Sequence, residues 1–297
     1  MMEATTGLCP VCQTGPRAWR SKRGYALAEC VSCGTVVASA LDGTATDPAH
    51  AYSEYHAAAH FVTPDVVEAS LERLASTAGS YRTSGTWLDL GFGEGSLLAV
   101  AERLGWRCFG TEVSPQALEH GSKRGWTVAV DPTADPRFRL ASFDVVTLIE
   151  VLEHVSFPRN FLRDAVGWLR PGGLLYLTTP NARSLNRWIL GAEWSIFCPP
   201  EHLHVMTAGA LRRLLPACGL AGVRVRAEGF NPAEVRARLV RRGENPPVNR
   251  QAEGLALSRS LSSTAPRRAL KGSVNTVLDF LGAGDTLKAR GHKPEWA

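Results

Sequence analysis

The segment 86–98, TWLDLGFGEGSLL, constrains the fold of this chain more than any other. It combines an apolar strand, a turn with glycine at every second position, and the start of a helix. Such a turn bends the backbone sharply and lets a ligand approach it closely, and the usual ligand is a nucleotide. A dinucleotide loop would have its third glycine at position 96, which is Ser96 here, so the spacing GxGxxG is absent. The spacing is GxGxG, with Asp89 two residues before Gly91.

A second strand, CFGTEV over 108–113, carries an acidic residue near its end. Glu112 follows the glycine turn by roughly twenty residues, the place where nucleotide-binding folds put a carboxylate on the ribose hydroxyls. A solvated glutamate at a strand end is the alternative. The glycine turn at this distance upstream favours Glu112 as a ribose ligand.

Two further segments follow in order, FDVVTLIEVLEHV over 143–155 and LRPGGLLYLTTPN over 169–181. With the glycine turn and Glu112, they resemble the class I S-adenosylmethionine (SAM) methyltransferases of the ubiquinone-biosynthesis type, at the EVLEHV and PGG signatures. The resemblance implies an α/β fold, a Rossmann-like doubly wound sheet of seven strands. It also implies SAM as the cofactor.

The resemblance also assigns a cofactor site. The residues that would bind SAM lie in or beside the glycine turn and at the ends of the next strands: Asp89, Gly91, Phe92, Gly93, Gly95, Glu112, Val113 and Glu150. In the loop 131–136, either Asp131 or Asp135 would contact the adenine, unless both only form turns. An aromatic segment with Tyr52, Tyr55 and His56 would either fold over the cofactor or only pack against the rest of the protein.

Four cysteines near the N-terminus form two CxxC pairs, Cys9 with Cys12 and Cys30 with Cys33. This spacing is typical of a zinc ribbon, because each pair can direct two thiolates at one tetrahedral centre. Sulfur ligands without histidine favour a closed structural Zn²⁺ site over iron. Unligated thiols are the alternative. Zinc should help to fold so short a segment.

The expected chemistry lies beyond the fifth strand, where the chain has Glu201, His202 and His204. His202 is the first candidate for a general base, with Glu201 orienting it and His204 and His154 in reserve. An unperturbed histidine pKa near 6.5 suits proton acceptance, and the adjacent Glu201 would raise it if the two side chains meet, which their loop position leaves open. A surface cluster, or a cap in the case of His154, is the alternative.

The whole sequence predicts five segments: a zinc ribbon (1–45), a linker and capping helix (46–80), the SAM-binding core (81–230), a basic helical insert (231–283), and the last core strand with the tail (284–297). The positive net charge of +5 is concentrated in the last two of these segments, from residue 231 onward. With neither a long apolar run nor a signal segment, we expect a cytoplasmic protein that does not enter membranes.

The resemblance predicts a methyltransferase for a small-molecule acceptor, as in natural-product or antibiotic biosynthesis, and an anionic, sugar-bearing or nucleotide-linked acceptor is compatible with it. One alternative is an rRNA base methyltransferase, since zinc ribbons precede this fold there too. The modest basic excess and the lack of NPPY after strand four argue against nucleic acid. A second alternative is a catalytically silent adaptor that binds SAM. The acceptor atom and the oligomeric state remain open.

Overall fold

The computed structural model describes residues 8–42, 65–232, 234–236 and 265–295. Tyr52, Tyr55 and His56 lie outside these ranges, as does most of the expected insert. Within the ranges, each helix is too short or too polar to span a bilayer.

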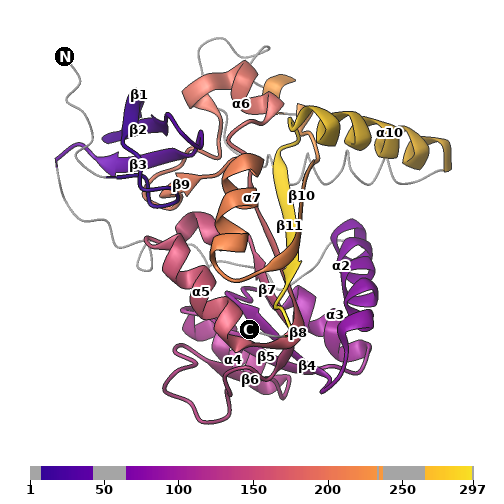
Figure 1. Ribbon diagram of the computed structural model, residues 1–297. Helices are drawn as coiled ribbons and strands as arrows, with labels where there is room; N and C mark the ends of the chain where they lie inside the picture. Colours follow the sequence, from indigo (N-terminus) through magenta and orange to yellow (C-terminus); the bar gives the residue numbers. More distant parts are fainter. Residues whose placement is uncertain (1–7, 43–64, 233, 237–264, 296–297) are drawn as a thin grey trace.

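A seven-stranded sheet forms the centre of the molecule, as the sequence predicts (Figure 1). Five neighbouring strands run parallel, and β11 lies antiparallel between β8 and β10. The strands, from one edge to the other, are β10 (Ala221–Glu228), β11 (Thr286–His292), β8 (Leu169–Pro180), β7 (Phe143–Ile149), β4 (Thr86–Leu90), β5 (Arg107–Thr111) and β6 (Thr127–Ala129). The strand order reverses beside β4, so the carboxyl ends of β4 and β7 form the crevice where doubly wound folds bind ligands.

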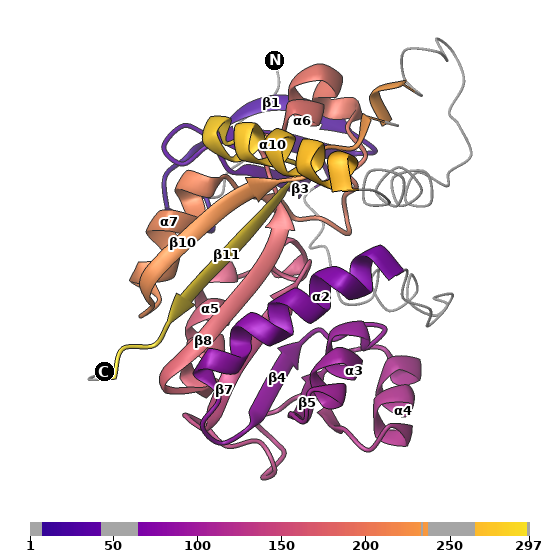
Figure 2. The ribbon, with the colours of Figure 1, turned by 90° about the vertical axis from the view of Figure 1, so that its right-hand side faces the viewer.

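Helices cover both faces of this sheet (Figure 2). On one face Trp87 and Val145 pack with α2 (Asp65–Ala78), α3 (Ser96–Arg103) and α4 (Pro115–Lys123). On the other, Leu88 and Val146 pack with α5 (Pro158–Trp168) and α7 (Ala208–Ala217). Consecutive residues of β4 and β7 thus pack against helices on opposite faces of the sheet, since side chains alternate along a strand.

The shorter elements lie around this core. They are α6 (Leu185–Leu190), the 3-10 turns η1 (Gly79–Tyr81), η2 (Leu152–His154) and η3 (Gly191–Glu193), and α10 (Ala265–Leu281). Helix α10 packs against β10 and precedes β11, so a helical segment does separate the last two strands, as expected.

The N-terminal ribbon is a small antiparallel sheet of β1 (Pro16–Lys22), β2 (Tyr25–Cys30) and β3 (Val36–Ala40). Its fourth strand comes from the core: β9 (His204–Val205) pairs with β3. Further along, Thr207 Oγ1 donates to the Cys33 carbonyl at 2.7 Å. The histidine loop, residues 201–204, is therefore joined to the ribbon through β9.

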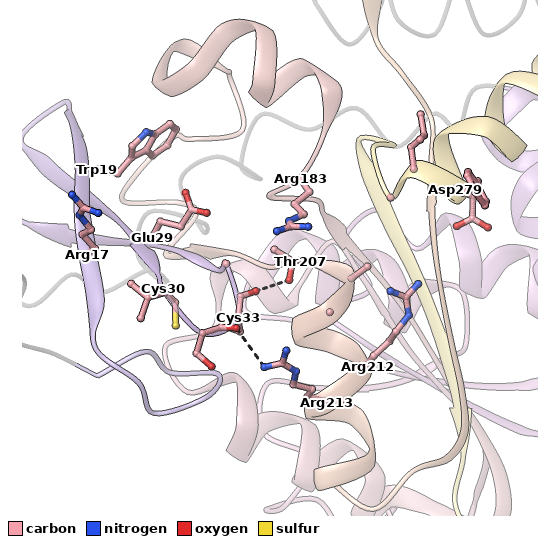
Figure 3. A pocket seen from close by; sticks show the side chains of 18 of the residues that line it. Arg17, Trp19, Glu29, Cys30, Cys33, Arg183, Thr207, Arg212, Arg213 and Asp279 are labelled. Atoms are coloured by element: carbon pink, nitrogen blue, oxygen red, sulfur yellow. Dashed lines mark hydrogen bonds between the residues drawn. The ribbon is translucent and has the colours of Figure 1, made fainter.

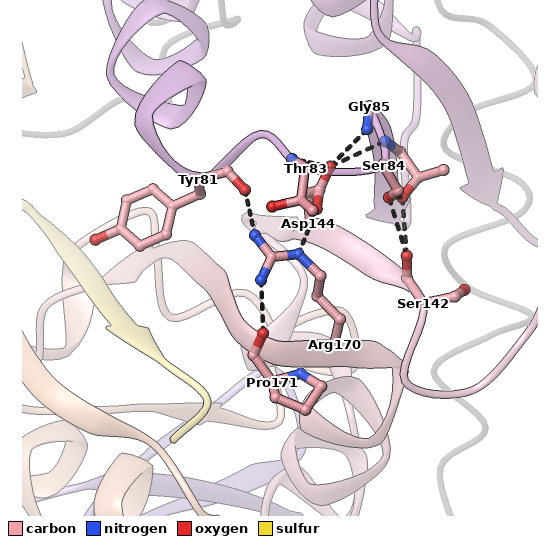
Figure 4. Close-up of polar contacts among 9 residues, drawn as sticks. Tyr81, Thr83, Ser84, Gly85, Ser142, Asp144, Arg170 and Pro171 are labelled. Atoms are coloured by element: carbon pink, nitrogen blue, oxygen red, sulfur yellow. Dashed lines mark hydrogen bonds and ion pairs between the residues drawn. The ribbon is translucent and has the colours of Figure 1, made fainter. Parts of the chain in front are cut away.

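Asp144 secures the amino-terminal end of the crevice strands (Figure 4). Its fully buried carboxylate pairs with Arg170 Nε at 2.5 Å and accepts from the backbone of Thr83 and Gly85 at 3.0 and 2.6 Å. Although burial opposes ionisation, the guanidinium and these N–H groups lower the pKa of Asp144. The interaction joins β7 and β8 to the segment that leads into β4.

We expect Asp144→Ala to lower the free energy of unfolding by about 3–5 kcal/mol, because it removes the acceptor of Arg170 Nε and of the backbone N–H groups at positions 83, 85 and 86. Since the pKa is depressed on folding, the stabilisation is complete above the unfolded value of about 3.9 and is lost as the pH falls through the folded one. Urea denaturation at neutral and acidic pH measures both effects. Asp135→Ala is the control, because its partner Arg137 is on the surface; an equal loss there would contradict the prediction.

Candidate functional site

The glycine turn lies at the carboxyl end of β4, directly against β5. The N–H of Gly91 donates to the Thr111 carbonyl at 2.8 Å. Gly91, Gly93 and Gly95 have φ angles of +71°, +52° and +75°, a region that side chains disfavour. A Cβ at Gly91 would lie 2.7 Å from Val151 Cγ2. The turn therefore needs glycine for its own backbone and for close packing on the loop after β7.

Glu112 is buried beneath this turn, where the sequence places the ribose ligand. Its carboxylate accepts from the Gly93 N–H at 2.9 Å, the Val113 N–H at 2.7 Å and the Ser114 N–H at 3.3 Å. A carboxylate has about four lone-pair sites, so one acceptor position remains. The residues present thus fit a ribose hydroxyl next to the exposed Val113.

Asp89 lies inside the sheet beside Glu112 rather than in the open crevice. It is 2% exposed, and its Oδ1 accepts from Thr147 Oγ1 at 2.6 Å. Burial raises the pKa of Asp89 to about 7, against the Thr147 hydrogen bond, and the charge of Glu112 adds to the shift. This hydrogen bond joins β4 to β7 just before the turn begins.

Three other predicted cofactor residues are engaged within the protein. Phe92 is buried, with its ring centroid 6.2 Å from that of Trp126. Asp131 accepts from the Thr133 N–H at 2.8 Å, and Asp135 pairs with Arg137 at 2.5 Å. The side chain of Phe92 is thus a core residue, and both aspartates stabilise their own loop.

The structure brings His154 and His202 together, with ring centroids 4.7 Å apart. His154 Nδ1 lies 2.7 Å from the Glu201 carbonyl, and His202 Nδ1 lies 2.7 Å from the Ile196 carbonyl. Carbonyl oxygens only accept, so each Nδ1 carries the proton in the neutral ring. The Nε2 of His202 is therefore left with its lone pair.

His202 does not keep the pKa near 6.5 of an unperturbed histidine. Burial and, secondly, the neighbouring His154 lower it to about 4, against the Ile196 hydrogen bond. The Glu201 carboxylate acts on Cys198 instead, where it adds to the effect of burial and raises the thiol pKa. Adjacency in sequence did not bring the Glu201 and His202 side chains together, because the His202 ring turns towards Ile196.

His204 has a structural position. It is 2% exposed in β9, and its Nε2 donates to the Leu152 carbonyl at 2.8 Å. Burial lowers its pKa to about 4. The Leu203 N–H beside it donates to the Glu153 carbonyl at 2.9 Å. These bonds hold the histidine loop against η2.

Sequence reasoning assigned no role to Glu153, whereas Glu150, which it selected, is exposed directly after β7. Glu153 is 1% exposed, and its Oε2 accepts from Thr179 Oγ1 at 2.8 Å. Its Oε1 has no hydrogen-bond partner among the described residues. Burial and the charge of Glu150 raise its pKa well above the usual range. The EVLEHV motif contains both acids, but only the fold distinguishes the buried one.

Among the described residues, two groups of side chains are close enough together to hold a metal ion. The Sγ atoms of Cys9 and Cys33 are 3.7 Å apart and those of Cys12 and Cys30 are 3.3 Å apart, with all four within 4.8 Å. Zn–S bonds of about 2.3 Å in a tetrahedron give similar spacings, so these residues fit zinc. The second group is Glu153, His154 and His202, also within 4.8 Å.

Comparison with known proteins adds to this geometry. A family model described as "Methyltransferase domain" matches residues 59–225, more than half of the chain. Ubiquinone biosynthesis O-methyltransferases from Cereibacter sphaeroides and Idiomarina loihiensis are 32% and 33% identical over 157 and 162 residues. Each match covers 49% of this chain and 64% or 65% of the relative, so the chain spans less than two thirds of their length.

Solved structures are similar in fold. A SAM dependent methyltransferase from Archaeoglobus fulgidus is 16% identical with a TM-score of 0.52, over 83% of this chain and 100% of that one. A putative sarcosine dimethylglycine methyltransferase from Galdieria sulphuraria, also 16% identical, has a TM-score of 0.50, over 84% and 99%. At this identity the likeness concerns the fold alone.

Proposed function

The chain belongs to the methyltransferase domain family, and we propose that it transfers a methyl group from SAM to a small-molecule acceptor. The observation that carries the proposal is the turn at Gly91–Gly95 closed over the buried Glu112. The relatives named O-methyltransferases favour a hydroxyl acceptor, although N- and C-methylation stay open. An acceptor from natural-product biosynthesis, or one bearing a sugar or a nucleotide, remains compatible.

SAM would supply the electrophilic methyl group. The glycine turn and Glu112 would hold the nucleoside part at the carboxyl end of β4, and η2 with the loop 201–204 would enclose the acceptor. Alignment in a site that excludes water gives effective molarities on the order of 10⁵ M or more. Where the acceptor must lose a proton, His202 Nε2 would accept it, and a positioned base adds roughly 10²- to 10⁴-fold.

We also propose that Cys9, Cys12, Cys30 and Cys33 hold a structural zinc ion. The support is the spacing of the four sulfurs and the burial of Cys9, Cys30 and Cys33. Four protein ligands would close the coordination shell, so the metal would take no direct part in catalysis.

The direct test is incubation with labelled SAM and either a small-molecule extract or total RNA. We expect label only in the small molecules. Label in RNA would support the base-methyltransferase alternative. SAM binding without transfer to either pool would support the silent adaptor.

Calorimetric titration tests the cofactor site. Glu112→Ala should weaken SAM binding by about 1–3 kcal/mol through loss of the ribose acceptor, and Gly91→Val should weaken it further by displacing the turn. Glu119→Ala, on the exposed face of α4, is the control and should bind like the parent. The same titration on Asp131→Ala and Asp135→Ala decides whether either contacts adenine. Unchanged affinity in Glu112→Ala and Gly91→Val would refute the assignment.

A further inference from the structure

A second cavity lies between the ribbon and helices α7 and α10 (Figure 3). Its volume is about 890 Å³, within the roughly 300–1,000 Å³ usual for small-ligand sites. Its lining includes neither the glycine turn nor the histidine loop. The cavity is therefore separate from the proposed methyl-transfer site.

Four arginines from three parts of the chain line this cavity. Arg17 belongs to β1, Arg183 precedes α6, and Arg212 and Arg213 lie on α7. Figure 3 shows Arg17 on the ribbon side and Arg212 on the side of α10. The arginines thus surround one volume instead of following a single exposed helix face.

The two carboxylates in the lining are already engaged. Glu29 Oε2 pairs with Arg187 at 2.5 Å, and Asp279 Oδ1 accepts from the Ala227 N–H at 2.8 Å. In the parts of the chain that the structure describes, no carboxylate lies within ion-pair distance of the four lining arginines. Among the described residues, the positive charge of these four arginines is therefore not neutralised by ion pairs.

Most guanidinium donors of the four arginines also have no acceptor within the described ranges. Arg212 Nη2 donates to the Val225 carbonyl at 3.1 Å, and Arg213 Nη1 donates to the Ser32 carbonyl at 3.4 Å. Each guanidinium has five N–H donors, so each of these arginines keeps several for a ligand.

We propose that this cavity binds the phosphate groups of a small phosphorylated molecule of about nucleotide size. Guanidinium groups form paired, charge-assisted hydrogen bonds with phosphate oxygens, and four of them can surround a diphosphate. The proposal rests on the cavity and its charges, and does not depend on methyl transfer.

Inorganic pyrophosphate, titrated calorimetrically into the full chain as purified, is the probe. We expect saturable binding at one site that weakens with salt. Arg183→Met and Arg213→Met should each weaken it by about tenfold or more, as expected for a lost charge-assisted bond. Asp279→Asn, which removes a negative charge and keeps an acceptor for the Ala227 N–H, should strengthen it.

Arg139→Met is the matched control, because Arg139 is exposed between β6 and β7 and its loss changes the net charge equally. It should bind pyrophosphate like the parent. Absence of binding in the parent, or equal weakening in Arg139→Met, overturns the proposal. Arginine-dependent binding of a single-stranded RNA of about twenty nucleotides without binding of pyrophosphate also overturns it, because the cavity would then belong to a nucleic-acid surface. Asp279→Asn should bind pyrophosphate more tightly, so it tests the proposal even if the arginine variants do not fold.

Discussion

Loss of the ribbon metal is expected to reduce turnover while SAM affinity is retained. Structural zinc contributes about 10–16 kcal/mol to the folding of zinc-finger peptides, so a ribbon without it should unfold first. Unfolding removes the partner strand of β9 and the Cys33 carbonyl that Thr207 contacts. The histidine loop then loses its support, whereas the glycine turn, built on β4 and β5, keeps its own.

Cys12→Ser provides this test, with metal analysis, SAM calorimetry and steady-state kinetics on the same preparation. The parent should contain close to one zinc ion per chain. Cys218→Ala, which alters a buried cysteine outside the ribbon, should keep the metal and the turnover. A parent protein without metal, together with a Cys12→Ser variant of equal thermal stability, would exclude the zinc ribbon.

Replacement of His202 should lower kcat by about 10²-fold or more with SAM affinity intact, if the acceptor must lose a proton. His202→Gln is the sharper variant, because the glutamine side chain is polar and similar in size to the imidazole but cannot act as a base. His204→Ala should instead lower thermal stability, since it removes a buried ring and its bond to Leu152. Near-full turnover in His202→Gln would show that His202 is not the base and that its ring has a structural role.

A dependence on added Fe²⁺ separates the base from a second role of the same ring, because imidazole and carboxylate ligands together suit this ion. A ring nitrogen of His202 lies within 4.8 Å of the ligand atoms of Glu153 and His154, a spacing that also fits a cation site. Turnover of the parent that is independent of added Fe²⁺ supports the base. A strict requirement for Fe²⁺, with metal binding lost in His202→Gln, supports the ligand.

Local signals predicted the glycine turn and the strand end that carries Glu112. Both follow from a few neighbouring residues, and in the structure the Gly93 N–H donates to the Glu112 carboxylate. The side chain of Phe92 was harder to place, because its neighbour Trp126 comes from a later segment. Sequence spacing thus located the turn better than the direction of each side chain.

The histidine side depended on contacts between distant residues. The pKa of His202 falls because the folded chain buries the ring beside His154. The sequence shows only the adjacent Glu201, which would favour a higher pKa. The pairing of β9 with β3 joins positions 204–205 to positions 36–37. No local pattern in a two-residue strand could have indicated it.

The shared sheet has a consequence for protein engineering. A boundary near residue 45 suggests that the ribbon can be deleted, or exchanged for that of a relative, as a separate module. Such a chimera would have to carry residues 204–207 with the new ribbon, because β9 and Thr207 complete its edge. A deletion would instead leave β9 as an unpaired edge, a known site of aggregation. The functional unit for grafting is therefore discontinuous in sequence.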